Sequence, residues 1–373
     1  MRPTDATDAA SAQPTSPFYA VIIAGGRGER FWPLSTSRAP KQLLRLFGGQ
    51  SLLAQAVNRL DGLVPPERRF LITTAEIRSA VLADSPAIPA DQIIGEPFGR
   101  DTAAAIALAC ALVRQRDPAA AFCVLTADHL IRPAERFRED LRLCLESALA
   151  KDDRLITIGI PPAYPAEGFG YLETDPDRDS GSFRAVRRFV EKPDQTRAQS
   201  YIAAGNYYWN SGMFVWSVKA LTRAFERHQP ALSRMMDRIP ERSAADALTE
   251  QLATIYEDLE KISIDYALME KAENVWMLPA GFEWHDVGSW SAVAEHFPAD
   301  QDGNTAVGLS ALVDSANNIV VGPEDHLIAL LGVNDLTVVN SGRATLVCPR
   351  DKIQEVKRVV EALKQSARTR DFL

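Results

Sequence analysis

The chain has 373 residues, of which 46% are hydrophobic and 24% charged, and its formal net charge is -8 at pH 7. This size predicts one large domain and a smaller one, because single hydrophobic cores stop growing at roughly 250–300 residues. No run rich in Lys and Arg stands out, and no apolar run approaches the ~18 residues of a membrane helix. Neither nucleic acid nor a membrane is therefore an expected partner.

The cysteines and the first residues indicate the compartment. Cys110, Cys123, Cys144 and Cys348 form no CxxC pair and lie in apolar contexts. This pattern predicts reduced, buried thiols in a cytoplasmic protein rather than disulfides or a zinc site. Residues 1–17 are rich in Ala, Ser, Thr, Asp and Pro and lack the features of a signal peptide. We expect a disordered tail there.

The first half of the chain alternates strand and helix patterns. Phe18–Ala24 is a continuous apolar run that ends at two glycines, which is typical of a buried parallel strand leading into a loop. Such alternation predicts an α/β fold whose functional loops follow the strands. Further strands are expected at Phe70–Thr73, Ala121–Thr126 and Leu155–Ile158, and helices at Ser51–Leu60 (with Ser51 as N-cap), Thr102–Arg116 and Phe137–Leu149.

The chain changes character after about residue 300. Short β-like runs recur there, separated by turn residues, and a last helix is expected over Lys352–Gln365 with one apolar face. We therefore expect a large domain over 18–298 and a small β-rich C-terminal domain with a terminal helix over 299–373. The expected C-terminal strands are Ile319–Val321, Leu327–Leu331, Leu336–Val339 and Thr345–Cys348.

The segment AGGRGER follows the first strand at residues 24–30. Glycines let a backbone approach a ligand closely and point N–H groups at phosphate oxygens. A dinucleotide fingerprint would need a third glycine where Phe31 stands, and a Walker loop would need Gly-Lys, which does not occur. Arg30 can fork two phosphate oxygens and Lys41 can add a point charge. These residues favour a phosphate-binding loop over a purely structural turn.

Two aspartates and a lysine stand out further along the chain. Asp128 ends an apolar strand, where a carboxylate needs a partner such as a metal ion, a helix N-terminus or a local hydrogen bond. Asp286, within WHDVGSW, has the same alternatives. Lys192, within VEKP, would by default be a surface lysine.

Eight segments follow one another over about residues 20–290: AGGRGERFWPLS with PKQ, EP with RDTA, ADH, GFGYLE, FVEKP, WNSGMF, SIDY and WHDVGSW. In this order they resemble the signature of the sugar-phosphate nucleotidyltransferases, and more closely that of the mannose-1-phosphate guanylyltransferases. The resemblance implies a Rossmann-like nucleotidyltransferase domain with a mixed, mostly parallel sheet, followed by a small left-handed β-helix-like domain. It also implies a homodimer that pairs through the C-terminal domain.

The activity implied by this resemblance is transfer of GMP from GTP to α-D-mannose 1-phosphate, which yields GDP-mannose and pyrophosphate with Mg²⁺ as cofactor. Family roles carry over to residues that match the motifs. They are Arg30, Lys41 and Lys192 for catalysis, Ala24, Gly25, Gly26, Gly28, Glu96, Arg100 and Thr102 for the nucleotide, Gly170, Glu173 and Asn210 for the sugar, and Asp128 and Asp286 for the metal.

Several positions depart from the family pattern and leave alternatives open. Thr126 stands where many relatives have Pro, Asp101 replaces Asn, and His285 precedes Asp286. The alternatives are the same chemistry with another sugar 1-phosphate or nucleotide, or a regulatory subunit that binds a nucleotide sugar without catalysis. A bifunctional enzyme with an isomerase domain is disfavoured, because only about 75 residues follow residue 298. Asp101 or Thr102 could also simply cap the following helix.

Overall fold

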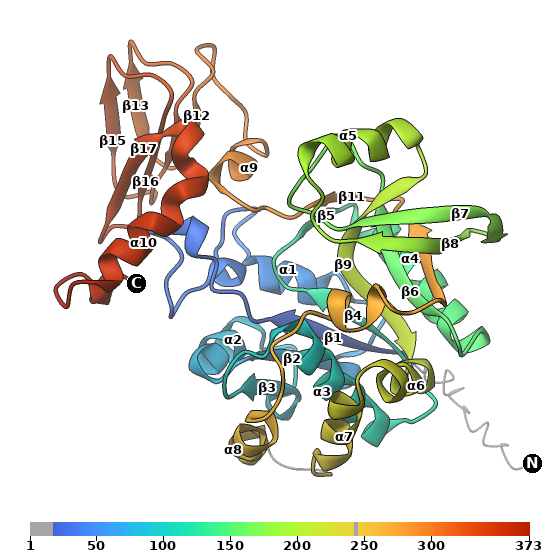
Figure 1. The fold of residues 1–373 in the computed structure, drawn as a ribbon. Helices are drawn as coiled ribbons and strands as arrows, with labels where there is room; N and C mark the ends of the chain where they lie inside the picture. Colours follow the sequence, from blue (N-terminus) through green and yellow to red (C-terminus); the bar gives the residue numbers. More distant parts are fainter. Residues whose placement is uncertain (1–17, 242–244) are drawn as a thin grey trace, which may run out of the picture.

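The computed structural model describes residues 18–241 and 245–373, so the tail expected over 1–17 lies outside the described residues. A central sheet of nine strands carries helices on both faces, and a smaller β-rich unit stands at one end (Figure 1). The strands in order across the sheet are β3 (Ile93–Glu96), β2 (Arg69–Thr74), β1 (Phe18–Ala24), β4 (Ala121–Thr126), β9 (Tyr207–Ser217), β6 (Leu155–Ile160), β10 (Val275–Pro279), β8 (Phe183–Val190) and β7 (Tyr171–Ser180).

Strand directions follow the family expectation of a mixed, mostly parallel sheet. The strands β3, β2, β1 and β4 are parallel neighbours, and β6 and β10 form another parallel pair. Only β9 and β8 run against the other strands of this sheet. The carboxyl ends of β1, β3 and β4 therefore meet at one edge, where an open α/β sheet binds its ligands.

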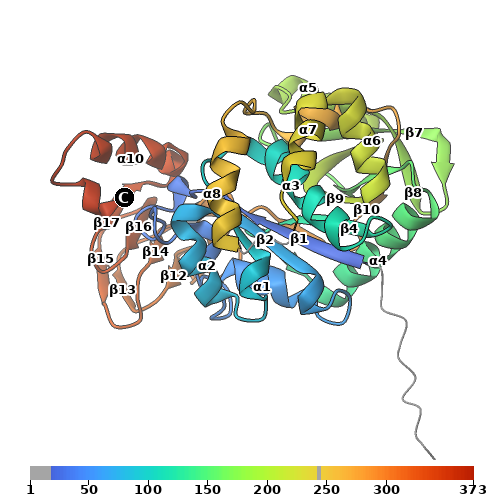
Figure 2. The same cartoon turned by 90° about the horizontal axis from the view of Figure 1, so that it is seen from below.

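Both faces of the sheet are covered by a hydrophobic core, and successive residues of β1 point alternately into one core and the other. Tyr19 and Val21 pack with the helix α3, whereas Ala20 and Ile22 pack with helices on the other face. Figure 2 shows α3, α7 and α8 on one side of β1 and β2, with α1 and α2 on the other. The helices are α1 (Leu52–Asn58), α2 (Arg78–Asp84), α3 (Asp101–Arg116), α4 (Ala134–Ala150), α5 (Gln195–Ala204), α6 (Val218–His228), α7 (Pro230–Arg238) and α8 (Ala245–Tyr256).

Helix ends partly follow the sequence expectations. The Ser51 hydroxyl accepts a hydrogen bond from the Ala54 backbone N–H at 2.8 Å, so the predicted N-cap of α1 is confirmed. The alternative that Asp101 caps α3 is met in part: the N-cap residue Arg100 makes no side-chain cap, but the Asp101 carboxylate accepts a hydrogen bond from the Thr102 backbone N–H at 2.8 Å. The Thr102 hydroxyl instead accepts a hydrogen bond from the Ile264 backbone N–H at 2.9 Å.

A small two-stranded sheet joins two loops that the sequence places far apart. β5 (Leu130–Arg132) pairs antiparallel with β11 (Glu283–His285), and His285 is the register partner of Leu130. Asp128 and Asp286 flank these strands, so the pairing brings the two aspartate loops to the same edge of the molecule.

The C-terminal unit is a coil of short parallel strands, closed by β17 (Thr345–Pro349), which pairs antiparallel with β16 (Leu336–Asn340). Ser310 pairs with Ile328 and Ile319 with Thr337, so in both cases the partners lie one turn of the coil apart. This arrangement confirms the expected β-helix-like domain. Its other strands are β12 (Thr305–Val307), β13 (Ser310–Val313), β14 (Ile319–Val321) and β15 (Ile328–Leu331). The expected terminal helix is divided into a 3₁₀ segment, Arg350–Glu355, and α10 (Val356–Lys364).

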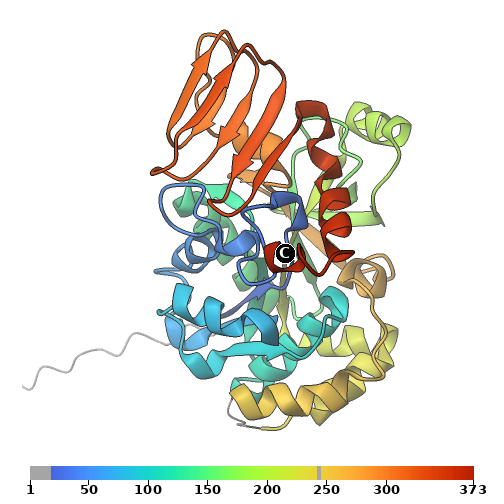
Figure 3. The ribbon, with the colours of Figure 1, turned by 90° about the vertical axis from the view of Figure 1, so that its left-hand side faces the viewer.

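The two units share one hydrophobic core. Phe31 and Trp32, from the loop after β1, pack in the same cluster as Val339 from β16 and Val356 from α10. Figure 3 shows α10 beside the loops that follow β1, and the short helix α9 (Trp290–Ala294) connects the units. The proposed domain division at 298/299 falls just after α9. No helix in the described part of the chain is long and apolar enough to cross a membrane.

Candidate active site

The loop after β1 is held in place from two directions. The Ala24 carbonyl accepts hydrogen bonds from the Thr73 hydroxyl at 2.8 Å and from the Gln42 side-chain amide at 2.9 Å. Gly28 has a φ of +63°, and a Cβ atom there would overlap the Lys41 Cβ and lie 2.9 Å from the Lys41 backbone nitrogen. Only glycine fits at this position, because the segment that carries Lys41 passes directly against it.

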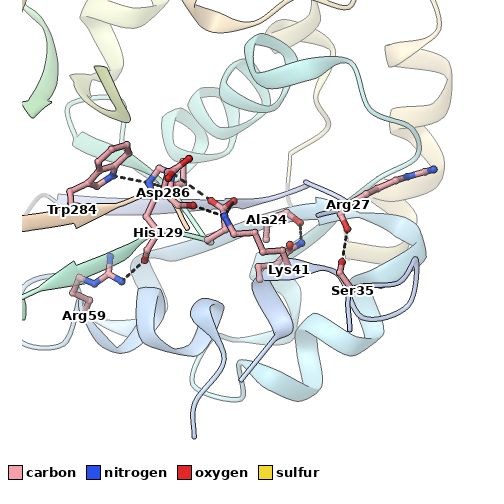
Figure 4. Close-up of polar contacts among 11 residues, drawn as sticks. Ala24, Arg27, Ser35, Lys41, Arg59, His129, Trp284 and Asp286 are labelled. Carbon is pink, nitrogen blue, oxygen red and sulfur yellow. Dashed lines mark hydrogen bonds and ion pairs between the residues drawn. The ribbon is translucent and has the colours of Figure 1, made fainter. Parts of the chain in front are cut away.

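Lys41 is the centre of the polar site (Figure 4). Its side chain is largely buried, and Nζ donates hydrogen bonds to the Asp128 carboxylate Oδ2 at 2.8 Å and to the Asp286 backbone carbonyl at 2.6 Å. The structure thus brings together three predicted residues from three separate motifs. An ammonium group has three donors, so one N–H of Lys41 remains for a ligand.

The surroundings of the two aspartates shift their pKa values in opposite directions. Burial would raise the pKa of Asp128, but the charge of Lys41 and the hydrogen bond from Lys41 outweigh it, so this pKa lies below its ordinary value. Burial raises the pKa of Asp286, which Lys41 lowers and the negative charge of Asp128 raises further. The two carboxylates therefore repel each other, which is the electrostatic situation that a cation relieves.

His129 lies between Trp284 and Asp128. Its Nδ1 accepts a hydrogen bond from the Trp284 indole N–H at 3.1 Å, and its Nε2 lies 3.7 Å from the Asp128 Oδ1. Burial lowers the pKa of His129 to about 4, although Asp128 raises it, so the imidazole is neutral at pH 7. The Nδ1 atom also lies 2.6 Å from the Thr126 hydroxyl, so Thr126 and Trp284 together hold the ring with its Nε2 facing Asp128.

Two neighbouring cavities meet at Asp128 and Arg27. The central cavity has a volume of about 400 Å³, and the β3–α3 cavity has a volume of about 590 Å³. The central cavity is lined by Arg27, Gly28, Glu29, Arg30, Phe31, Lys41, Asp128, His129, Asp286, Gly288 and Lys357. The β3–α3 cavity is lined by Ala24, Gly25, Gly26, Glu96, Asp101, Thr102 and Lys261 among others.

Glu96 is an acidic group buried beside the β3–α3 cavity. Desolvation raises its pKa to about 7, against the lowering effect of a hydrogen bond with Tyr256. Its Oε1 has no hydrogen-bond partner among the described residues. A buried carboxylate oxygen without a partner is costly, so this atom is suited to accept hydrogen bonds from a ligand.

Arg100 does not join the β3–α3 cavity. Its guanidinium donates to the backbone carbonyls of Tyr256 at 3.0 Å and Glu257 at 2.6 Å, just beyond the end of α8. Thr102 does line the cavity, but its hydroxyl is used by Ile264, as described above.

A second polar cluster lies beside the first half of β9. The Asn210 side-chain amide donates to the Asp265 carboxylate at 3.0 Å, and the Asn210 backbone N–H donates to the Gly170 carbonyl at 2.8 Å. Lys192 has a φ of +46° and forms an ion pair with Glu191, whose Oε2 lies 2.6 Å from where a Gly170 Cβ would be. Three predicted residues, Gly170, Lys192 and Asn210, are therefore neighbours.

Glu173 lies apart from this cluster. Its carboxylate pairs with Arg188 at 2.9 Å, and it lines none of the three cavities that adjoin the aspartates among the described residues. By contrast, Asp265 belongs to the cluster although its motif was assigned no role. Burial and the charge of Glu191 raise the pKa of Asp265 to about 6.

A third cavity of about 990 Å³ opens on the far side of Asp286. It shares Arg30, Asp286 and Gly288 with the central cavity. Its aromatic wall consists of Tyr164, Phe169, Trp209, Phe282 and Trp284. Sequence reasoning missed this wall, because the rings come from three separate segments of the chain that become neighbours only in the folded structure.

Other site residues were missed for different reasons. Arg27 and Glu191 stand inside quoted motifs, so their polar side chains were a usable signal. Lys357 lines the central cavity from α10, outside every motif, and nothing in the sequence marked it.

The aspartate pair can hold a cation only if a ligand completes the site. In residues 18–241 and 245–373 no group of three or more His, Cys, Asp or Glu side chains could hold a metal ion. Asp128 and Asp286 line one cavity and repel each other, and Mg²⁺ is commonly bound by one or two carboxylates together with phosphate oxygens and waters. The residues present therefore fit such an ion.

Comparison with known proteins identifies the family. Residues 19–303 match the family model described as nucleotidyl transferase, and residues 308–363 match the model of the MannoseP isomerase/GMP-like β-helix domain. The chain therefore belongs to the nucleotidyl transferase family.

Curated relatives and a solved structure show which members of this family the chain resembles. The chain is 36% identical over 362 residues to the mannose-1-phosphate guanylyltransferase of Klebsiella pneumoniae, covering 94% of this chain and 74% of the relative. It is 35% identical to the alginate biosynthesis protein AlgA of Pseudomonas aeruginosa, covering 94% and 73%. A crystal structure from Thermus thermophilus, described as a mannose-1-phosphate geranyltransferase, has a TM-score of 0.82 and 36% identity, covering 93% of this chain and 99% of that one. Within the family, the chain is an enzyme of the mannose-1-phosphate guanylyltransferase type.

Proposed function

We propose that this enzyme transfers GMP from GTP to α-D-mannose 1-phosphate in the cytoplasm, releasing pyrophosphate and forming GDP-mannose. The observation that carries the proposal is the position of Lys41, which bonds Asp128 and the Asp286 carbonyl at the junction of the two cavities. In this arrangement the nucleoside lies in the β3–α3 cavity and its phosphates lie in the central cavity. The names of the relatives support GTP and mannose 1-phosphate as the substrates.

The chemistry requires charge control more than proton transfer. A phosphate oxygen of the sugar phosphate attacks the α-phosphorus, the bond to the β-phosphate oxygen breaks, and pyrophosphate leaves with the electron pair. The nucleophile is largely anionic near pH 7, because a phosphate monoester has a second pKa of about 6. No general base is needed, so Arg30 and Lys41 act by offsetting negative charge on the transferring group.

Asp128 and Asp286 are proposed to hold Mg²⁺ together with substrate phosphate oxygens. A bound Mg²⁺ would offset phosphate charge and help to bring two anionic substrates together. Lys41 keeps the Asp128 carboxylate ionised, and His129 packs beside this carboxylate with Nε2 at 3.7 Å from Oδ1.

The sugar phosphate is proposed to approach from the cluster beside β9. Lys192 contacts its phosphate, and Asn210 with the backbone at Gly170 contacts the hexose. Gly212, two residues after Asn210, lies against Thr126 at the end of β4, which leads to Asp128, so this cluster adjoins the central cavity. Glu173 is proposed as a further sugar ligand, which would require release of its pairing with Arg188.

The test is pyrophosphate release with Mg²⁺ over a matrix of GTP, ATP, UTP and dTTP against mannose, glucose and fucose 1-phosphates. The proposal expects release with GTP and mannose 1-phosphate well above every other pair. Release with a different pair would retain the mechanism and replace the substrates. No release with any pair would favour the regulatory-subunit alternative.

A further inference from the structure

The helix α10 places one lysine in the central cavity. Lys357 lines this cavity together with Arg27, Arg30 and Lys41, although it comes from the C-terminal unit. It is the second residue of α10 and lies next to the buried residue Val356. Because Val356 and Val360 are fixed in the shared core with Phe31 and Trp32, the rotation of α10 about its axis is set, and with it the position of Lys357.

Several polar contacts tie the segment around α10 to the loop after β1. The Lys364 ammonium pairs with the Glu29 carboxylate at 3.2 Å. The Trp32 indole N–H donates to the Phe372 carbonyl at 2.8 Å, and the Ser37 hydroxyl donates to the Leu373 backbone oxygen at 3.2 Å. The end of the chain is thus fastened to the segment that carries Arg27 and Arg30.

Lys357 differs from the other cations of this segment. Lys352 and Arg358 both pair with Glu355, and Lys364 pairs with Glu29 and Glu361. In the described ranges, Lys357 forms no ion pair and is the residue of α10 that lines the central cavity. The central cavity is lined by three acids, Glu29, Asp128 and Asp286, and by four cations, of which Lys357 is the one from α10. The charge of Lys357 therefore tips the balance toward a positive potential, which favours a polyanion.

We propose that Lys357 binds the outer phosphates of the nucleoside triphosphate and the pyrophosphate formed from them, so that the C-terminal domain completes the phosphate site. This inference rests on the proposed function. The assignment to the outer phosphates follows from position. The β3–α3 cavity, which is proposed to hold the nucleoside, is lined by Glu96 and Thr102 and meets the central cavity at Asp128. Lys357 lines the central cavity from the side of α10.

The test is calorimetric binding of GTP, inorganic pyrophosphate and GMP, each with Mg²⁺, to the full chain and its variants. Lys357→Ala should weaken GTP and pyrophosphate binding about tenfold, because a charge-assisted contact is lost. GMP lacks the outer phosphates, so its affinity should stay unchanged. Lys357→Arg should recover most of the loss, since it restores the charge. Arg358→Ala, the adjacent cation of the same helix, is the matched control and should bind all three ligands like the parent protein.

The outcomes separate this inference from the proposed function. Equal weakening of GMP and GTP, or unchanged pyrophosphate binding, would overturn the role of Lys357 while leaving the enzyme's activity intact. In steady-state assays the Lys357→Ala variant should show a raised KM for GTP with little change in the KM for mannose 1-phosphate. The reverse pattern would also overturn the inference. A parent enzyme that is inactive in the substrate matrix but binds pyrophosphate through Lys357 would instead contradict the proposed function alone.

Discussion

At the scale of single residues, the site depends on a few charges whose partners are decided by the loops around them. Lys41 is bonded to Asp128 and to the Asp286 carbonyl, so it both neutralises and positions the acidic pair. Glu96 remains buried with one oxygen unpaired, and Lys192 is paired with Glu191. Each of these groups gives a distinct prediction.

Removal of the Asp128 charge tests the metal assignment. Asp128→Asn should lower the Mg²⁺-dependent kcat by about a hundredfold or more, because Asp286 would then be the only carboxylate of the proposed pair left to bind the ion. The fold should persist, since this side chain lines a cavity rather than a core. Asp237→Asn, which breaks a remote ion pair with Arg114, is the control for the loss of a surface charge. Near-parental turnover of Asp128→Asn over a Mg²⁺ titration would contradict the assignment.

Loss of the Lys192 ammonium should act on the sugar phosphate. Lys192→Ala should raise the KM for mannose 1-phosphate about tenfold, with a smaller effect on the KM for GTP. Lys219→Ala removes another exposed lysine that pairs with an acid and serves as the control. An effect confined to the KM for GTP would show that Lys192 has a different role.

Glu96 predicts a pH dependence of nucleotide binding. Desolvation raises its pKa to about 7, and only the ionised carboxylate can accept two N–H donors from a base. The KM for GTP should therefore rise as the pH falls below about 7, approaching about tenfold per pH unit. Glu96→Gln should bind GTP more weakly at pH 8 and should lose this slope, apart from the titration of GTP itself. Parallel pH profiles for the two proteins would exclude Glu96 as the titrating group.

At the scale of elements, the loop after β1 passes directly against the segment that carries Lys41, and this contact fixes the position of the Lys41 side chain. Gly28→Ala should lower stability by about 2 kcal/mol and reduce kcat, because the new Cβ pushes against the segment of Lys41. Gly48→Ala also requires a left-handed backbone but meets open space, so it measures the backbone cost alone. Thermal unfolding of both variants isolates the contact with Lys41. Equal losses of stability would show that this contact contributes nothing.

At the scale of the whole molecule, exposed apolar side chains on the β-helix-like unit support the expected homodimer. Val313 in β13 and Leu331 in β15 are register partners, and Leu309 and Leu327 stand directly before these strands; all four side chains are more than half exposed. Monomeric proteins rarely expose a contiguous apolar patch of this kind without a partner.

Light scattering after gel filtration tests the dimer. The parent chain should elute as a dimer, and Leu331→Asp, at a side chain that is 74% exposed, should shift it to a monomer, since an unpaired charge would be buried in the interface. Leu143→Asp places the same change on the exposed side of α4 and should leave the dimer intact. A monomeric parent chain, or a dimer unaffected by Leu331→Asp, would contradict this interface.

The sequence alone determined the strands β1, β2, β4 and β6 and the helices α1, α3 and α4, together with the β-rich C-terminal unit, the family and its reaction class. It did not place the strands and helices between about residues 160 and 295. Continuous apolar runs can only be buried strands or helices, and the motif glycines and charges are local features that need no partner to be recognised. Asp128, Asp286 and Lys41 line one cavity, because β1 and β4 end at the same edge of the sheet and the pairing of β5 with β11 brings the Asp286 loop to that edge.

Only the tertiary structure decided which side chains face one another. Arg100 lies within a motif yet turns toward the end of α8, and Glu173 is taken by Arg188 from a neighbouring strand. Asp265 joins Asn210 and Lys357 reaches the central cavity from α10, because partners distant in sequence are chosen by packing of whole elements. The direction of a side chain follows from the rotation of its helix about the helix axis or from the register of its strand. Hydrophobic burial sets both for the entire element, so no local pattern encodes them.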